Sequence, residues 1–265
     1  MTGSCTASHE APDREGYVRM MIRERIGHAL GGTAIGGTVE YALDTLYGAL
    51  HPELLRDGAD EDERRRMLPG DDLVPQPMWE ATRVESIGAA PEGIWPWLVQ
   101  LGFGRGGWYA WSPFVDPVIR RSAMSIQPEY QTIALGDVML DGPGCNERIG
   151  AWTVRAIDEP RSLVLYSLRD PFTGVELDPW QRGARYLDCS WAFVLVSRGE
   201  TTRLLVRTRV TFAPRIAAPA LRLVFGPGDT VMQRTMLQGI RDRVLHAGAR
   251  DYGGGDSRTV EIKSR

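Results

Sequence analysis

The first pattern with chemical meaning is Gly-Phe-Gly-Arg-Gly-Gly at 102–107, which spells the G-x-G-x-x-G fingerprint of dinucleotide-binding loops. That loop works when a strand enters it and a helix leaves it, because the helix N-terminus then meets the pyrophosphate. Here the order is reversed. Residues 91–101 have the apolar spacing of a helix, and the aromatic run at 107–111 is typical of a strand. The pattern therefore indicates a tight turn, and we expect no nucleotide or other cofactor.

The residue types present also limit nucleophilic and metal chemistry. All four histidines lie outside residues 52–245, and the only lysine is Lys263. Catalysis of the Ser-His-Asp or Cys-His kind and Schiff-base chemistry are therefore not expected in the central region. Because Cys5, Cys145 and Cys189 lack the paired spacing of zinc ligands, we expect no metal site. We interpret Cys145 and Cys189 as small buried apolar residues.

Acid–base chemistry stays open at two positions. A carboxylate buried beside aromatic rings has a raised pKa and acts as a general acid or base, and Glu129 is the candidate for that role. Tyr109 is a second catalytic candidate. The alternative for Glu129 is structural, with its side chain capping a turn or pairing with Arg120 or Arg121, and we favour this interpretation.

Seven predicted strands and a long helix must position these residues. Alternating and β-branched patterns predict strands at 81–86, 107–111, 137–140, 150–157, 162–168, 189–197 and 203–212. Pro-Gly-Asp at 227–229 is a good start for a helix over 230–246, whose apolar face includes Met232 and Met236. Gly239 allows that helix to approach its neighbours closely. The order predicts an α+β fold in which a curved antiparallel sheet wraps around the C-terminal helix.

Two charge patterns bear on the surface. Arg203, Arg207 and Arg209 alternate with apolar residues, so we expect the apolar side chains to face the core and the arginines to meet solvent or carboxylates. An anion-binding patch would require the opposite orientation. The mixed charges at 56–66 are typical of a solvated helix face or a tether, and we assign this segment no function.

The composition divides the chain into four parts. We predict a disordered tail at 1–16, a helical extension with a charged linker at 17–66, the sheet-and-helix domain at 67–247 and a polar tail at 248–265. The uncharged stretch at 29–39 is too short to cross a bilayer, which needs about 20 apolar residues.

Partners and location follow from charge and cysteine content. A net charge of -3 favours neither nucleic acid nor acidic lipid. The helices at 17–50 are predicted to pack on the domain or on a second subunit in a homodimer, and weak contact with a membrane surface is the alternative. Three scattered cysteines and no leader-like segment lead us to expect a reducing, cytoplasmic location.

The sequence also carries a family resemblance over 68–247. The matching pieces are Leu-Pro-Gly-Asp at 68–71, Ile-Trp-Pro-Trp-Leu-Val-Gln-Leu-Gly at 94–102, Gly-Arg-Gly-Gly-Trp-Tyr at 104–109, Gln-Pro-Glu-Tyr-Gln at 127–131, Leu-Gly-Asp at 135–137 and Met-Leu-Gln-Gly-Ile at 236–240. They resemble the bacterial polyketide cyclase/dehydrase-like group of the START-like helix-grip (SRPBCC) superfamily. The resemblance implies a hydrophobic pocket between sheet and helix for lipids, sterols, polyketides or hormones, with cyclisation chemistry in some members.

All eight tryptophans lie between Trp79 and Trp191, which favours an aromatic pocket. The predicted ligand-binding residues are Trp97, Tyr109, Trp111, Trp152, Tyr166, Trp191, Met232 and Met236, and plain core packing is the alternative for each one. The long connections at 112–135 and 169–188 predict lids, with Trp180 as a plug.

Three functions remain as hypotheses. The first is a cytoplasmic protein that binds a hydrophobic small molecule without catalysis. The second is a metal-free lyase or isomerase of cyclase or dehydratase type, in which Glu129 or a pocket tyrosine transfers a proton. The third is an interaction module joined through its N-terminal helices.

Overall fold

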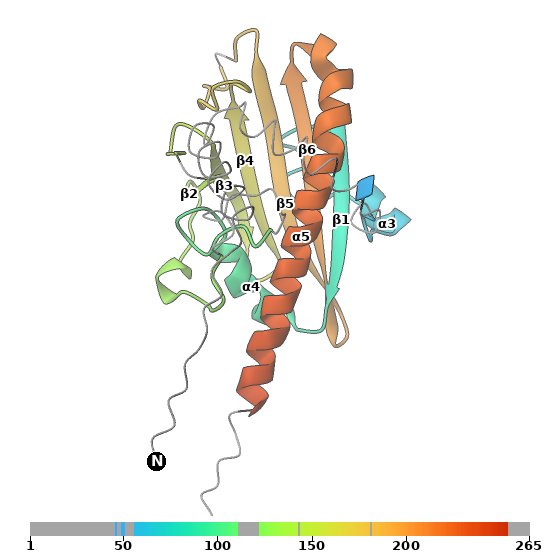
Figure 1. The fold of residues 1–265 in the computed structure, drawn as a ribbon, viewed down its shortest axis with the longest axis vertical. Coiled ribbons are helices and arrows are strands. Elements are labelled where there is room, and N and C mark those ends of the chain that lie inside the picture. The colour runs from blue at the N-terminus through green and yellow to red at the C-terminus, as the bar shows by residue number, and fades with distance from the viewer. Residues whose placement is uncertain are drawn as a thin grey trace, which may run out of the picture.

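Six antiparallel strands and one long helix form the frame of the described chain (Figure 1). The computed structural model describes residues 46, 49–50, 56–110, 122–142, 144–180 and 182–253, without the side chains of 217–225 and 248–253. The elements are α3 (Glu61–Arg65), β1 (Trp79–Ile87), α4 (Pro91–Val99), η2 (Pro128–Tyr130), β2 (Val138–Leu140), β3 (Ala151–Asp158), β4 (Ser162–Arg169), β5 (Tyr186–Arg198), β6 (Thr201–Ala213), η3 (Arg215–Ala217) and α5 (Ala218–Gly253). The predicted tail 1–16, nearly all of the predicted helices over 17–50, and Trp111 lie outside the described residues.

The sheet has the strand order β1-β6-β5-β4-β3-β2, and every neighbouring pair is antiparallel. The longest hairpin joins β5 and β6 at Gly199, whose φ of +66° favours glycine. Figure 1 shows α5 crossing one face of the sheet over β6 and β1. The predicted α+β architecture, a curved antiparallel sheet against a C-terminal helix, is confirmed.

The C-terminal helix begins earlier than the sequence predicts. Instead of starting after Pro227 and Gly228, α5 passes through them. Asp229 does not act as a capping residue, because its carboxylate pairs with Arg83 of β1 and accepts hydrogen bonds from Gln233. A tertiary ion pair therefore takes the side chain that the sequence assigns to the helix start.

The inner face of the sheet, which faces α5, holds the main core. Side chains at alternating positions of β5, such as Trp191 and Phe193, are buried against Met236, Leu237 and other apolar residues of α5. Gly239 lies where α5 comes closest to the rest of the core, since a Cβ atom there would lie 2.2 Å from the backbone oxygen of Tyr109. The predicted close approach at this glycine is confirmed.

The outer face of the sheet is also covered, by apolar residues of the segment 57–76. Arg203 forms an ion pair with Glu63 at 2.6 Å, and Arg207 forms one with Asp71 at 2.8 Å. The prediction that these arginines meet carboxylates, with the apolar side chains facing the core, is confirmed.

The charged segment at 56–66 differs from the predicted solvated tether. Asp60 caps α3 in a reciprocal capping box with Glu63, and Glu63 is buried. Mixed charges in a sequence predict solvent exposure, but here Glu63 pairs with Arg203 of β6, and Arg207 of β6 donates to backbone oxygens of the segment. The segment therefore belongs to the folded domain.

The glycine turn lies between α4 and the inner face of the sheet. Gly102 and Gly107 form an isolated bridge, and the Gly107 N–H donates to the Gly102 oxygen at 3.0 Å. The predicted strand at 107–111 is wrong for the described residues 107–110, which form no strand after that bridge. The reason is local, because Tyr109 has a φ of +57°, a left-handed conformation that a strand does not contain.

Candidate functional site

Four aromatic rings form a cluster on the inner face, and Trp191 of β5 is its centre. Trp108 stacks on the Trp191 ring with centroids 5.2 Å apart and planes at 24°. Trp152 of β3 and Phe193 of β5 each lie 5.2 Å from the same ring. The turn after α4 and two strands of the sheet therefore bring together rings that are far apart in the sequence.

The indole N–H groups of this cluster are not equally satisfied. Trp108 donates to the backbone oxygens of Leu140 and Asp141, both at 3.1 Å, and Trp152 donates to the Asp141 carboxylate. The buried Trp191 Nε1 has no hydrogen-bond partner in the described part of the chain. Leaving such a group unpaired costs about 1–3 kcal/mol. A bound molecule with an acceptor atom would remove that cost.

Asp141 is the polar end of the cluster. Its carboxylate also pairs with the Arg169 guanidinium, which lies 5.4 Å from the centroid of the Trp152 ring. Cys189 is buried on the same face, and burial raises the pKa of its thiol to about 12. The thiol is therefore protonated at neutral pH, and the interpretation of Cys189 as a small buried apolar residue is confirmed.

Three apolar side chains at one end of the interface between sheet and helix are only partly buried. Leu187 of β5, Val210 of β6 and Met232 of α5 pack against the core but stay partly exposed. Deeper in the interface, side chains such as Met236 are fully buried. These partly exposed apolar side chains lie at the end of the interface where β5 begins and β6 ends.

Most of the predicted ligand-binding residues lie on this inner side. Trp97, Tyr109, Trp152, Trp191 and Met236 are buried in one core cluster, and Met232 is packed against it. Trp97 and Tyr109 make an edge-to-face contact at 5.9 Å. Trp97 belongs to α4 and the Tyr109 backbone lies against Gly239 of α5, so these two residues lie where α4 meets α5.

Tyr109 does not fit the predicted catalytic role. Its hydroxyl donates to the Trp97 oxygen at 3.2 Å and accepts from Gln100 Nε2 at 2.8 Å. Burial raises the pKa of this phenol above its usual range. The hydroxyl proton is therefore held in place, and Tyr109 fixes α4 against the core.

Three other predicted positions need correction. Tyr166 lies on the outer face with Val74 and Leu168, because even-numbered residues of β4 point away from α5. Glu129 is exposed in η2, so it does not lie among buried aromatic rings as the catalytic role requires. Trp180 is 93% exposed, so it plugs no cavity in this conformation.

The sequence interpretation missed a buried polar cluster between β1 and α5. Arg83 pairs with Asp229 at 2.8 Å and donates to Thr230 and Gln233. Glu85 pairs with two further arginines of α5. The sequence interpretation assigned these charged residues of β1 no role beyond the predicted strand at 81–86. The one available signal was their spacing, since Arg83 and Glu85 lie two residues apart and so share a face.

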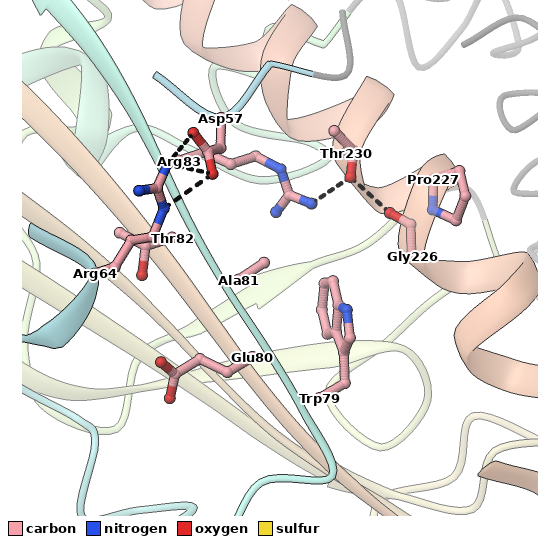
Figure 2. Close-up of a pocket in the computed structure, with 10 residues that line it drawn as sticks. All are labelled: Asp57, Arg64, Trp79, Glu80, Ala81, Thr82, Arg83, Gly226, Pro227 and Thr230. Atoms are coloured by element: carbon pink, nitrogen blue, oxygen red, sulfur yellow. Dashed lines mark hydrogen bonds and ion pairs between the residues drawn. The ribbon is translucent and has the colours of Figure 1, made fainter. Parts of the chain in front are cut away.

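A pocket of about 450 Å³ lies beside this polar cluster, between β1 and the start of α5 (Figure 2). Its lining residues are Asp57, Arg64, Trp79, Glu80, Ala81, Thr82, Arg83, Gly226, Pro227 and Thr230. None of them is a predicted ligand-binding residue. The volume falls within the range of about 300–1,000 Å³ that is typical of small-ligand sites.

Neither a metal cluster nor a membrane span is present in the described part of the chain. No three His, Cys, Asp or Glu side chains there group as metal ligands. No helix there has the length and apolar character needed to cross a membrane.

Comparison with known proteins adds distant structural likenesses. No family model matches the chain, and no curated protein matches it. Similar solved structures include a protein from Mesorhizobium loti, which is 14% identical with a TM-score of 0.38 and covers 63% of this chain and 98% of its own. Another, from Nitrosomonas europaea, is 11% identical with a TM-score of 0.40 and covers 65% of this chain and 97% of its own. A third, from Mycobacterium smegmatis, is 16% identical with a TM-score of 0.38 and covers 67% of this chain and 94% of its own. At these values the likenesses do not bear on function.

Proposed function

We propose that the protein binds a hydrophobic small molecule between the inner face of the sheet and α5, with Trp191 as the centre of the site. The observation that carries the proposal is the buried indole N–H of Trp191, which has no hydrogen-bond partner among the described residues and lies in an apolar, aromatic core cluster. Aromatic rings supply a large contact area for an apolar ligand body. The ligand class is therefore a mostly apolar compound with one hydrogen-bond acceptor.

We infer that a ligand enters this site at the end of the interface where β5 begins and β6 ends. Leu187, Val210 and Met232 are apolar and partly exposed there. Methionine adapts to irregular ligand shapes because its side chain is flexible. A ligand entering at this end would first contact Met232, which packs against the core cluster that holds the aromatic rings.

The proposal agrees with the sequence resemblance to the START-like superfamily and with the expectation of a lipid, polyketide or similar ligand. It retains the predicted cytoplasmic location. The catalytic alternative receives no support from its two named residues, because Glu129 is exposed and the Tyr109 hydroxyl is fully engaged.

The test compares two tryptophan variants with 1-anilinonaphthalene-8-sulfonate, a fluorophore with an apolar aromatic body and an anionic sulfonate that accepts hydrogen bonds. Trp191→Phe keeps an aromatic ring and removes the N–H, and Trp180→Phe is the matched control at an exposed position. We expect the dye to bind the wild type and Trp180→Phe equally. Loss of one hydrogen bond to the charged sulfonate predicts about tenfold or more weaker binding to Trp191→Phe. Equal binding by all three proteins, or no binding, contradicts the proposal.

A further inference from the structure

The free edge of β1 presents unpaired backbone groups. β1 is the outermost strand, next to β6 alone. The Val84 N–H donates outward to the Asp57 oxygen at 2.7 Å, and the Val84 oxygen accepts from Arg234 at 3.2 Å. Because backbone groups alternate between the two sides of an antiparallel strand, Thr82 and Glu80 also point outward. In the described part of the chain, their N–H and C=O groups have no partners.

These unpaired groups lie in the 450 Å³ pocket, which makes them part of a shaped site (Figure 2). One wall is the start of α5, with Pro227 and Thr230. The opposite wall is Asp57 with Arg64. The Trp79 ring lies at one end of the groove, and the bond between Asp57 and Val84 closes the other.

The charges around the groove are already neutralised in pairs. Asp57 pairs with Arg64, Glu80 with Arg209 and Arg83 with Asp229, each at 2.8 Å. An ionic ligand would have to break one of these pairs. A neutral ligand with alternating donors and acceptors would not, and it would satisfy the backbone of β1.

We propose that this groove binds a short extended peptide of another protein, which adds to the sheet as a strand beside β1. In an antiparallel arrangement, one peptide residue exchanges two hydrogen bonds with Thr82, and the residue two positions along does the same with Glu80. The residue between them places its side chain on the same face as Ala81, between Trp79 and Pro227. That middle side chain is therefore expected to be apolar.

The probe is a pool of pentapeptides, acetylated and amidated at their ends, with valine in the middle and the other positions randomised. The measurement is amide hydrogen exchange of Glu80 and Thr82 in the full-length protein by NMR. We expect the pool to slow exchange at both amides at least threefold. A pool N-methylated at its second and fourth residues loses the pairing donors and is expected to give no protection. A pool N-methylated only at the third residue is expected to protect.

Two variants test the same hydrogen bonds from the protein side. Glu80→Pro removes the outward N–H, and proline is tolerated in an edge strand when its nitrogen faces outward. Glu80→Ala removes the same side chain and keeps the N–H, so it serves as the matched control. We expect Glu80→Pro to bind the pool about threefold to tenfold more weakly than Glu80→Ala.

Three results would overturn the peptide proposal. The first is no protection of Thr82 and Glu80 by the unmethylated pool, and the second is equal binding by Glu80→Pro and Glu80→Ala. The third is protection of both amides without peptide. In that case the edge is already occupied, by a second copy if protection rises with protein concentration and by the chain itself if it does not.

Discussion

Gly239 is the position at which a single added carbon tests how α5 lies against the core. A Cβ atom there would lie 2.2 Å from the backbone oxygen of Tyr109 and 3.1 Å from its Cβ. A backbone oxygen cannot rotate away as a flexible side chain can. We therefore expect Gly239→Ala to force α5 away from Tyr109 and to loosen one wall of the proposed ligand site.

The expected loss follows from two opposing effects. Overpacking of a core costs about 1–3 kcal/mol, and a contact this short belongs at the upper end. Alanine gains about 1 kcal/mol over glycine in a helix interior. The net destabilisation of Gly239→Ala is about 2 kcal/mol, which lowers Tm by about 4–8 °C in a domain of this size.

The matched control is Gly93→Ala in α4. A Cβ atom at Gly93 meets only the Ala89 Cβ, at 3.8 Å, an ordinary contact. This variant is therefore expected to keep or slightly raise the wild-type stability. Urea unfolding and thermal melting of both variants give the comparison. The reasoning is refuted if Gly239→Ala is as stable as the wild type and Gly93→Ala.

Two further predictions concern the outer face of the sheet. The Arg207 guanidinium donates five hydrogen bonds, to Asp71, Thr82 and three backbone oxygens. A lysine ammonium cannot reproduce this planar set of donors. Arg207→Lys is therefore expected to lower the free energy of unfolding, measured in urea, by about 3 kcal/mol. Residues 57–76 should then be cut faster by protease, and unchanged cutting would contradict this account. Burial raises the pKa of the Asp188 carboxyl in the folded protein. Its contribution to the free energy of unfolding is therefore fully present below its unfolded pKa of about 3.9, and it is lost as pH rises through the folded pKa. Asp188→Asn does not titrate, so its stability relative to the wild type should rise from pH 4 upward and then level off. A difference that is flat with pH would count against a raised pKa.

The sequence predicted the frame of the fold because its signals are local. A few neighbouring residues are enough to recognise each of them: the alternation along β5 and β6, the turn at Gly199 and the apolar face of α5. The strand at 107–111 was mispredicted for the opposite reason. Its aromatic residues look like a strand, but the left-handed conformation of Tyr109 depends on packing against α4 and α5.

The candidate site was less predictable, because facing directions depend on tertiary contacts. β4 is apolar on both sides, so its pattern gave no sign that Tyr166 faces outward. Arg83 and Asp229 are far apart in the sequence, and each looks solvent-exposed until both are placed at one interface. The aromatic cluster was anticipated through Trp152 and Trp191, but that the Trp191 N–H has no partner among the described residues becomes visible only with its neighbours in place.

The most direct test of the central claim is native mass spectrometry of the protein purified from its own host without denaturation. The account predicts a mass above that of the polypeptide, carried by a mostly apolar compound that organic solvent extracts. It also predicts that Trp191→Phe retains less of this compound than Trp180→Phe does. Detection of the bare polypeptide alone, or equal retention by the two variants, would contradict binding at the aromatic cluster.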